Sequence, residues 1–145
     1  MDYTSGSLGR VFVARVDHGE DLLAALTGLA DAEEVEVGAV LVLGALTNGR
    51  MAQGPTALAL PPVPVFTAFE DGRELLGAGT LLREEGRPVL HLHAATGRAD
   101  ATSIGCLREQ AGVYATVEVV LFELLLGARR RMDPASGFSR VEFGA

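Results

Sequence analysis

The segment Arg87-Pro88-Val89-Leu90-His91-Leu92-His93 holds two of the three histidines of this 145-residue chain. Val89 to Ala95 is predicted to be a strand, because apolar residues follow a Glu-Glu-Gly-Arg turn and Pro88 suits the first position of a strand. Side chains alternate between the two faces of a strand, so His91 and His93 share a face. They lie roughly 6.5–7 Å apart along it, close enough to converge on one ion.

The only cysteine follows shortly, in Ile104-Gly105-Cys106-Leu107. Imidazole nitrogens and a thiolate together suit zinc, so His91, His93 and Cys106 are the candidate metal ligands and zinc is the expected ion. Three protein ligands leave a fourth position open, as in catalytic zinc sites. A second interpretation stays open, in which the histidines are polar residues on a half-exposed face and Cys106 is a small buried hydrophobe.

Composition favours one globular domain over residues 1–145, with residues 1–7 expected to be disordered. The chain is 48% hydrophobic and 21% charged, and no apolar run is long enough to span a membrane. The first residues lack the basic and apolar regions of a signal peptide. One cysteine excludes an internal disulfide, so we expect a protein of the reducing cytoplasm.

The net charge of −7 disfavours direct binding of nucleic acid, since a polyanion is repelled by an acidic protein. All twelve basic residues are arginines, and their only cluster is Arg129-Arg130-Arg131. This cluster at the end of a strand is interpreted as an interface or a solvated edge.

One helix is expected near the N-terminus, after a strand from Leu8 to Val16. Asp17 is the candidate N-cap, and apolar residues from Leu22 to Ala30 fall on one helical face. The helix is expected to end within Ala32 to Glu34.

The rest of the chain has the pattern of strands. The predicted strands are Val37–Leu46, Met51–Leu60, Val65–Phe69, Leu75–Leu82, Val89–Ala95, Val113–Leu125 and Ser139–Phe143. Thr47-Asn48-Gly49-Arg50 has the composition of a hairpin turn, Gly97 to Ser103 that of a surface loop, and Arg108 to Gly112 that of a short polar segment. The sequence therefore predicts an α+β domain with a mostly antiparallel, curved sheet around one main helix.

Several short segments also stand in a characteristic order. They are Gly19-Glu20-Asp21-Leu22, Gly38-Ala39-Val40, Gly44-Ala45-Leu46-Thr47-Asn48, Leu76-Gly77-Ala78-Gly79-Thr80, Gly86-Arg87-Pro88, His91-Leu92-His93, Thr116-Val117-Glu118-Val119-Val120 and Arg131-Met132-Asp133-Pro134-Ala135-Ser136-Gly137-Phe138. This order resembles the plants-and-prokaryotes conserved (PPC) domain family, over nearly the whole chain.

The resemblance implies a sheet wrapped around one helix, a homotrimer, and a stand-alone prokaryotic member of a family often labelled DNA-binding by association. Plant members carry a separate basic AT-hook, whose Arg-Gly-Arg-Pro core is missing here; the nearest string is Glu85-Gly86-Arg87-Pro88. In the family a third histidine joins the first two in a small polar site, and Cys106 occupies its place. Ile104 stands where the family has a glycine, which makes the local backbone less permissive.

Two functions remain open. The first is a trimeric, DNA-associated or regulatory module without chemistry of its own, which would meet nucleic acid only through protein partners. The second is a small zinc-dependent enzyme, similar to a hydrolase, with Glu118 or Glu20 as a candidate general base. Direct DNA binding is a third, weaker interpretation, and His18 is interpreted as a surface residue.

Overall fold

The computed structural model describes residues 1–144 as one helix and eight strands, and the expected α+β fold is confirmed. In chain order the elements are β1 (Ser7–Asp17), α1 (Leu22–Ala32), β2 (Val37–Pro55), β3 (Pro64–Phe69), β4 (Arg73–Glu84), β5 (Arg87–Arg98), β6 (Ala101–Leu125), β7 (Ala128–Asp133) and β8 (Phe138–Phe143). No helix in the described part of the chain is long and apolar enough to cross a membrane. The disorder expected for residues 1–7 stays a prediction, and β1 begins at Ser7.

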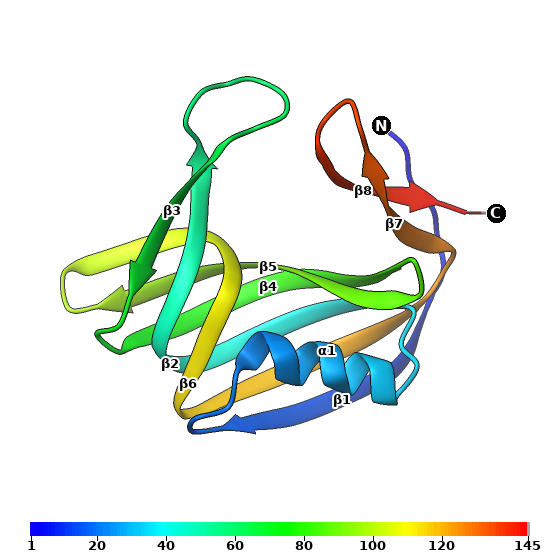
Figure 1. The fold of residues 1–145 in the computed structure, drawn as a ribbon. Helices are drawn as coiled ribbons and strands as arrows, with labels where there is room; N and C mark the ends of the chain where they lie inside the picture. Colours follow the sequence, from blue (N-terminus) through cyan, green and yellow to red (C-terminus); the bar gives the residue numbers. More distant parts are fainter. Residues whose placement is uncertain (145) are drawn as a thin grey trace.

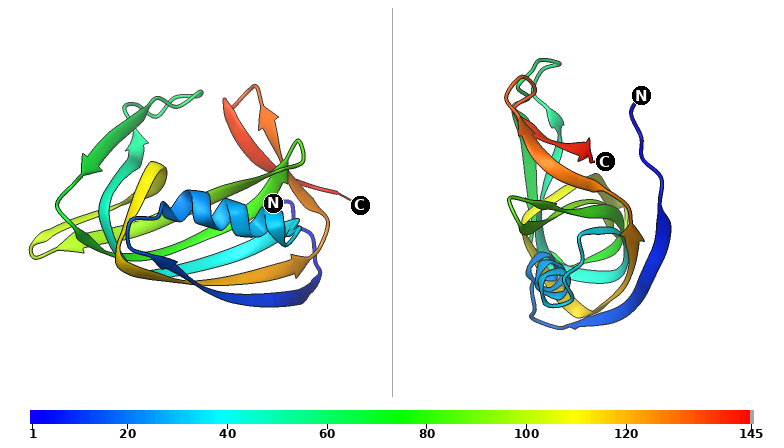
Figure 2. Two further views of the ribbon diagram at one scale, coloured as in Figure 1. Left: turned by 60° about the horizontal axis from the view of Figure 1, so that its bottom comes forward. Right: turned by 90° about the vertical axis from the view of Figure 1, so that its right-hand side faces the viewer.

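Six strands form one antiparallel sheet in the order β1-β6-β5-β4-β2-β3, with β6 also paired to β2. Because β2 pairs with β4, β4 with β5, β5 with β6 and β6 with β2, these four strands form a closed circuit of pairings. Figure 1 shows the resulting curved sheet with α1 lying along it, and the right-hand view of Figure 2 shows the strands curling around the end of the helix. β7 and β8 form a separate hairpin near the C-terminus.

The two longest strands, β2 and β6, pair from Gly38–Glu123 to Ala52–Cys106. Their register shifts at three places, between Gly44 and Ala45, between Leu46 and Asn48, and between Gly49 and Arg50. Bulges of this kind increase the local bend and twist of a strand pair. Gly44 has a φ of 149°, and a Cβ there would lie 2.3 Å from the carbonyl oxygen of Thr116, so this bend requires glycine.

The hairpin turn predicted at Thr47 to Arg50 is therefore wrong, because β2 runs through it. Turns and bulges favour the same residue types, and the side chains here form hydrogen bonds that stabilise the bulge. Thr47 Oγ1 donates to the Gly112 carbonyl at 2.9 Å, and Asn48 Oδ1 accepts from the Gly112 amide at 3.4 Å.

Two other segments predicted as loops belong to the sheet. Ser103 pairs with Thr96, and the connection between β5 and β6 is only a turn at Ala99 and Asp100. Residues 108–112 lie within β6. Polar composition misled the prediction here, because one face of these strands is exposed and tolerates polar side chains.

The helix begins one turn later than predicted. Asp21 rather than Asp17 is the N-cap, since its Oδ1 accepts from the Ala24 amide at 2.9 Å. Its other oxygen accepts from the Ala111 amide at 2.9 Å and so joins the helix start to β6. The expected C-terminal end is confirmed at Ala32.

The core lies between α1 and the concave side of the sheet. The helix contacts β5 and β6 and buries Leu22, Leu26 and Ala30, which stand four residues apart on one face. Fully buried strand residues include Val40, Val42, Leu46, Met51, Leu81, Leu92, Val113, Val117 and Leu121. Burial of each large aliphatic side chain contributes roughly 1.5–3 kcal/mol.

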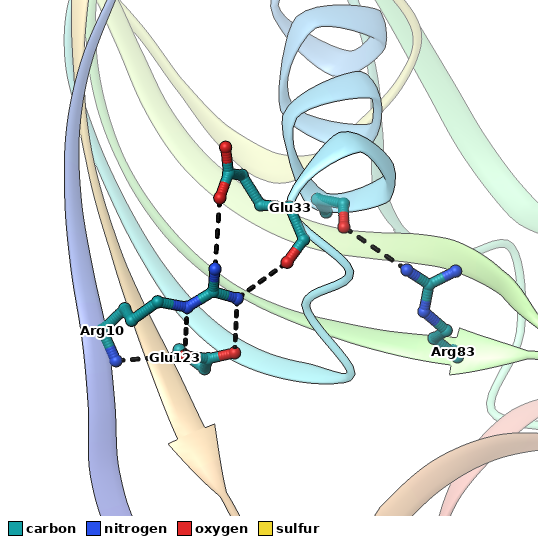
Figure 3. A network of polar contacts seen from close by, with 5 residues as sticks. Arg10, Glu33, Arg83 and Glu123 are labelled. Carbon is teal, nitrogen blue, oxygen red and sulfur yellow. Dashed lines mark hydrogen bonds and ion pairs between the residues drawn. The ribbon is translucent and has the colours of Figure 1, made fainter.

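Two arginines secure the C-terminal end of α1 (Figure 3). Arg10 on β1 donates through Nη2 to the carbonyl of Glu33, the C-cap, at 2.7 Å, and through Nε to Glu123 at 2.8 Å. Arg83 on β4 donates to the carbonyl of Ala30 and to that of Val35, both at 3.3 Å. The Val35 amide also donates to the Ala30 carbonyl at 2.9 Å, so the carbonyls at and just beyond the last helical turn are hydrogen-bonded by these groups together.

This network predicts a specific dependence of stability on pH. The hydrogen bond from the Arg10 side chain, followed by that from its backbone amide, lowers the pKa of Glu123 from 4.5 to about 2. A carboxyl with a depressed folded-state pKa stabilises the fold above its unfolded pKa and loses this contribution as pH falls from about 4.5 to about 2. Glu123→Gln should therefore be less stable than wild type at pH 7, and the gap should close toward pH 2.

Urea unfolding followed by circular dichroism at several pH values measures this gap. Glu70→Gln is the control, since no hydrogen bond or ion pair of the Glu70 side chain is present among residues 1–144. A gap that persists unchanged at low pH would contradict the role assigned to Glu123.

Candidate metal centre

The two histidines of β5 face each other on the outer side of the sheet. Leu92 and Ala94, which alternate with them, are buried in the core, so His91 and His93 point outward and are partly exposed. Their Nε2 atoms lie 3.1 Å apart, and the rings meet edge to face with centroids 4.9 Å apart. The predicted strand thus places both imidazoles on one side, with nitrogens directed at a common point.

Cys106 reaches the same point from the neighbouring strand. It is the residue of β6 directly opposite His93, and its side chain faces the same side of the sheet. One potential ligand atom from each of His91, His93 and Cys106 lies within 4.8 Å of the other two. The structure therefore brings together the three residues that the sequence predicted, across a pairing that spacing alone does not define.

The donor set fits zinc. Ligand atoms around a tetrahedral zinc lie roughly 3.3–3.8 Å apart, as bonds of about 2.0–2.3 Å require. The two nitrogens, 3.1 Å apart, already approach this separation, and one ligand atom from each of the three residues lies within 4.8 Å of the others. Cys106 is only 6% exposed, so one side of the site is shielded from water while the histidine side is open.

Positive charge surrounds the site. Partial burial, followed by the charges of Arg130, His93 and Arg108, lowers the pKa of His91. A lowered pKa keeps the imidazole neutral at neutral pH, which is the form that binds a metal ion. The lowered pKa of His91 therefore reduces competition between protons and a metal ion at this imidazole.

Arg130 is the residue near this site that the sequence analysis missed. It belongs to the Arg129–Arg131 cluster, which was interpreted as an interface or solvated edge. β7 instead turns its middle arginine inward, where it is 8% exposed and donates to Thr80 Oγ1 at 3.1 Å. Alternation along a strand was the available signal, because the middle residue of three must face the opposite side from its neighbours.

The two carboxylates considered as general bases lie elsewhere. Glu118 stands opposite Leu43, and Leu43 is separated from β5 by β4. The Glu20 carboxylate accepts from the Asp17 amide at 2.7 Å, beside the start of α1. No carboxylate of the described residues joins the three candidate ligands.

The third histidine is remote from the cluster, as expected. His18 is exposed, and its Nδ1 accepts from the Ala115 amide at 3.3 Å. Its ring also meets Tyr114 edge to face.

Comparison with known proteins identifies the fold. A sequence model of the Plants and Prokaryotes Conserved (PCC) domain matches residues 3–125, which is the domain that the sequence resemblance indicated. No curated protein matches the chain as a relative.

Solved structures share the architecture at low sequence identity. A metal-containing protein from Archaeoglobus fulgidus has a TM-score of 0.85 and 18% identity, covering 97% of this chain and 98% of its own. A plant- and prokaryote-conserved (PPC) protein from Pyrococcus horikoshii has a TM-score of 0.82 and 23% identity, covering 100% and 99%. A "putative DNA binding protein" from Bacteroides thetaiotaomicron has a TM-score of 0.81 and 18% identity, covering 95% and 97%. Identities this low establish the shared fold alone.

Proposed function

Because the chain belongs to the Plants and Prokaryotes Conserved domain family, we propose that it is a zinc-binding member that works as a homotrimeric interaction module. One observation carries the metal part of this proposal: ligand atoms of His91, His93 and Cys106 lie within 4.8 Å of one another. The metal content of the similar A. fulgidus protein supports it. We assign the protein to the cytoplasm, where a lone cysteine stays reduced.

The outer face of the sheet supports the assembly part of the proposal. Reading across the strands, one row of outward residues runs Val13, Val120, Leu41, Ala78, His93 and Cys106. The next row begins with the charged pair Arg15 and Glu118 and continues with apolar residues, namely Leu43, Leu76, Ala95 and Ile104.

Large apolar side chains on these rows are open to solvent: Val13 is 80% exposed, Leu76 68% and Ile104 71%. A contiguous apolar surface of this kind marks an interface between proteins. Further copies of the same chain are the occupant we propose, and the row that ends at Cys106 brings the metal ligands to the edge of that interface.

Charge pairing argues against direct DNA contact. Eight of the twelve arginines form ion pairs with carboxylates of the described chain, namely Arg10, Arg15, Arg50, Arg73, Arg83, Arg129, Arg131 and Arg140. Few cations are left to replace the counterions of a duplex, and the net charge is −7. In our proposal any association with DNA, which the name of the B. thetaiotaomicron protein suggests for that protein, is mediated here by a protein partner.

A small zinc-dependent hydrolase is the second candidate function. The observation that favours it is the three-ligand set, which leaves one position for a substrate atom, next to the positive charges of Arg130 and Arg108. Zinc at this site would supply Lewis acidity to a group at the open position. The absence of a carboxylate from the cluster formed by the described residues makes the module the preferred function.

The metal proposal is tested by elemental analysis of protein purified without a histidine tag. We expect about one zinc per chain, and Cys106→Ser should weaken zinc affinity about tenfold or more, because a neutral hydroxyl replaces the thiolate. His18→Ala is the matched control and should bind as wild type does. Protein that neither carries zinc nor takes it up after dialysis against zinc would overturn the proposal.

The assembly proposal is tested by light scattering. We expect a mass roughly three times the 15.2 kDa of the chain. Leu41→Asp, in the middle of the outer apolar face, should dissociate the assembly because a charge cannot be buried there without a partner. Tyr3→Asp, an exposed position before β1, should leave the mass unchanged. A wild-type mass near that of one chain would reject the trimer.

The DNA proposal is tested by gel shift with the protein alone at physiological salt. We expect no tight binding that depends on sequence, for the electrostatic reason given above. Specific retardation of a duplex by the isolated protein would show that it reads DNA without a partner.

A further inference from the structure

Arg130 is the one buried arginine that has no carboxylate partner among residues 1–144. The other unpaired arginines, Arg87, Arg98 and Arg108, are exposed. Arg130 donates from Nη1 to the Ser139 carbonyl at 3.3 Å and from Nη2 to Thr80 Oγ1 at 3.1 Å. Its Nε is buried and has no hydrogen-bond partner. A buried charge with an unused donor is costly, so a partner for it is expected.

The position of Arg130 links it to the metal ligands. Thr80, which accepts its hydrogen bond, is the residue of β4 directly opposite His91. The Thr80 hydroxyl accepts from the guanidinium, so its own proton is free to be donated. Burial is the largest influence on the pKa of Arg130 and lowers it; the charge of Glu84 raises this pKa, and the charge of Arg108 lowers it.

Arg108 supplies a second positive charge on the same side. It follows Cys106 by two residues on β6, so both side chains face outward, roughly 6.5–7 Å apart. No carboxylate of the described residues forms an ion pair with it. The Glu84 carboxylate, which accepts from Ser139 Oγ at 2.5 Å, is the nearby negative charge and raises the pKa of Arg130, but it forms no ion pair with either arginine among the described residues.

We propose that Arg130, Arg108 and the Thr80 hydroxyl form a binding subsite for an oxyanion beside His91, His93 and Cys106, and that the ligand carries a phosphate or carboxylate group. Arginine presents several N–H donors in a planar fork that matches such oxygens. An anion here also offsets the repulsion between a metal cation and two unpaired guanidinium groups. This inference rests on the proposed metal site and adds the ligand class that would share it.

Equilibrium dialysis with labelled inorganic phosphate at constant ionic strength tests the subsite, with zinc content measured on the same samples. We expect zinc-loaded wild-type protein to bind about one phosphate per chain. Arg130→Gln should weaken phosphate binding about tenfold or more, and Arg108→Gln should weaken it several-fold, while zinc stays bound in both. Arg131→Gln is the control of equal charge change, since Arg131 pairs with Glu142 at 3.1 Å, and it should stay within about twofold of wild type.

A parallel series with acetate as competitor distinguishes the two ligand chemistries. Displacement of phosphate by acetate at similar concentration indicates a carboxylate ligand, and retention indicates a phosphate ligand. If circular dichroism shows that Arg130→Gln does not fold, the test relies on Arg108→Gln, because Arg108 is exposed and its substitution leaves the core intact.

Three results would overturn the inference. If wild-type protein carries about one zinc per chain but binds no phosphate, the subsite is rejected while the metal site stands. This would be the result if a carboxylate from a second copy already paired with Arg130. Equal losses of phosphate affinity in Arg131→Gln and Arg130→Gln would show that the effect comes from the net charge of the protein and not from a specific contact. Phosphate binding at full strength in both Arg130→Gln and Arg108→Gln would place the anion elsewhere. Failure to bind zinc would instead count against the proposed function.

Discussion

The pairing of β2 with β6 is the constraint on which the rest of the molecule depends. It runs from Gly38–Glu123 to Ala52–Cys106, and its register shifts bend both strands. Because of this bend, the first part of β6 returns to β5 while its last part continues beside β1. A straight β6 could not pair with both. The concave side that results is filled by α1, and the opposite side carries the metal ligands and the apolar rows.

The sequence predicts well whatever depends on local periodicity. The helix, the strand character of most segments and the shared face of His91 and His93 follow from spacings of two, three and four residues. The sequence predicts poorly where the same residue types are compatible with two different local structures. Thr47-Asn48-Gly49 is typical of a hairpin turn, yet here it forms bulges inside a long strand, and only the partner residue Gly112 across the sheet decides between them.

The candidate site shows the same division. Two ligands come from one strand and are predictable from alternation, whereas Cys106 is suggested by its thiolate chemistry and by its place in the family pattern. Its pairing with His93 depends on the turn at Ala99 and Asp100, which was predicted as a longer loop. Arg130 lies 24 residues after Cys106, on a hairpin outside the main sheet, and only tertiary packing brings it to Thr80. Its neighbours Arg129 and Arg131 remain on the surface and pair with Glu142.

The distance in sequence between β1 and its partner also bears on how the molecule folds. Arg10 and Glu123 are 113 residues apart in the chain and adjacent in the sheet. During synthesis β1 and α1 are complete long before β5 and β6, the strands that the helix contacts, so the hydrophobic side of the helix stays uncovered until those strands follow. A fold dominated by such non-local pairings is slow to form for its size and exposes unpaired strand edges in the interval. Because β1 pairs with Thr116 to Leu125 of β6, this edge of the sheet can form only after most of the chain has been synthesised.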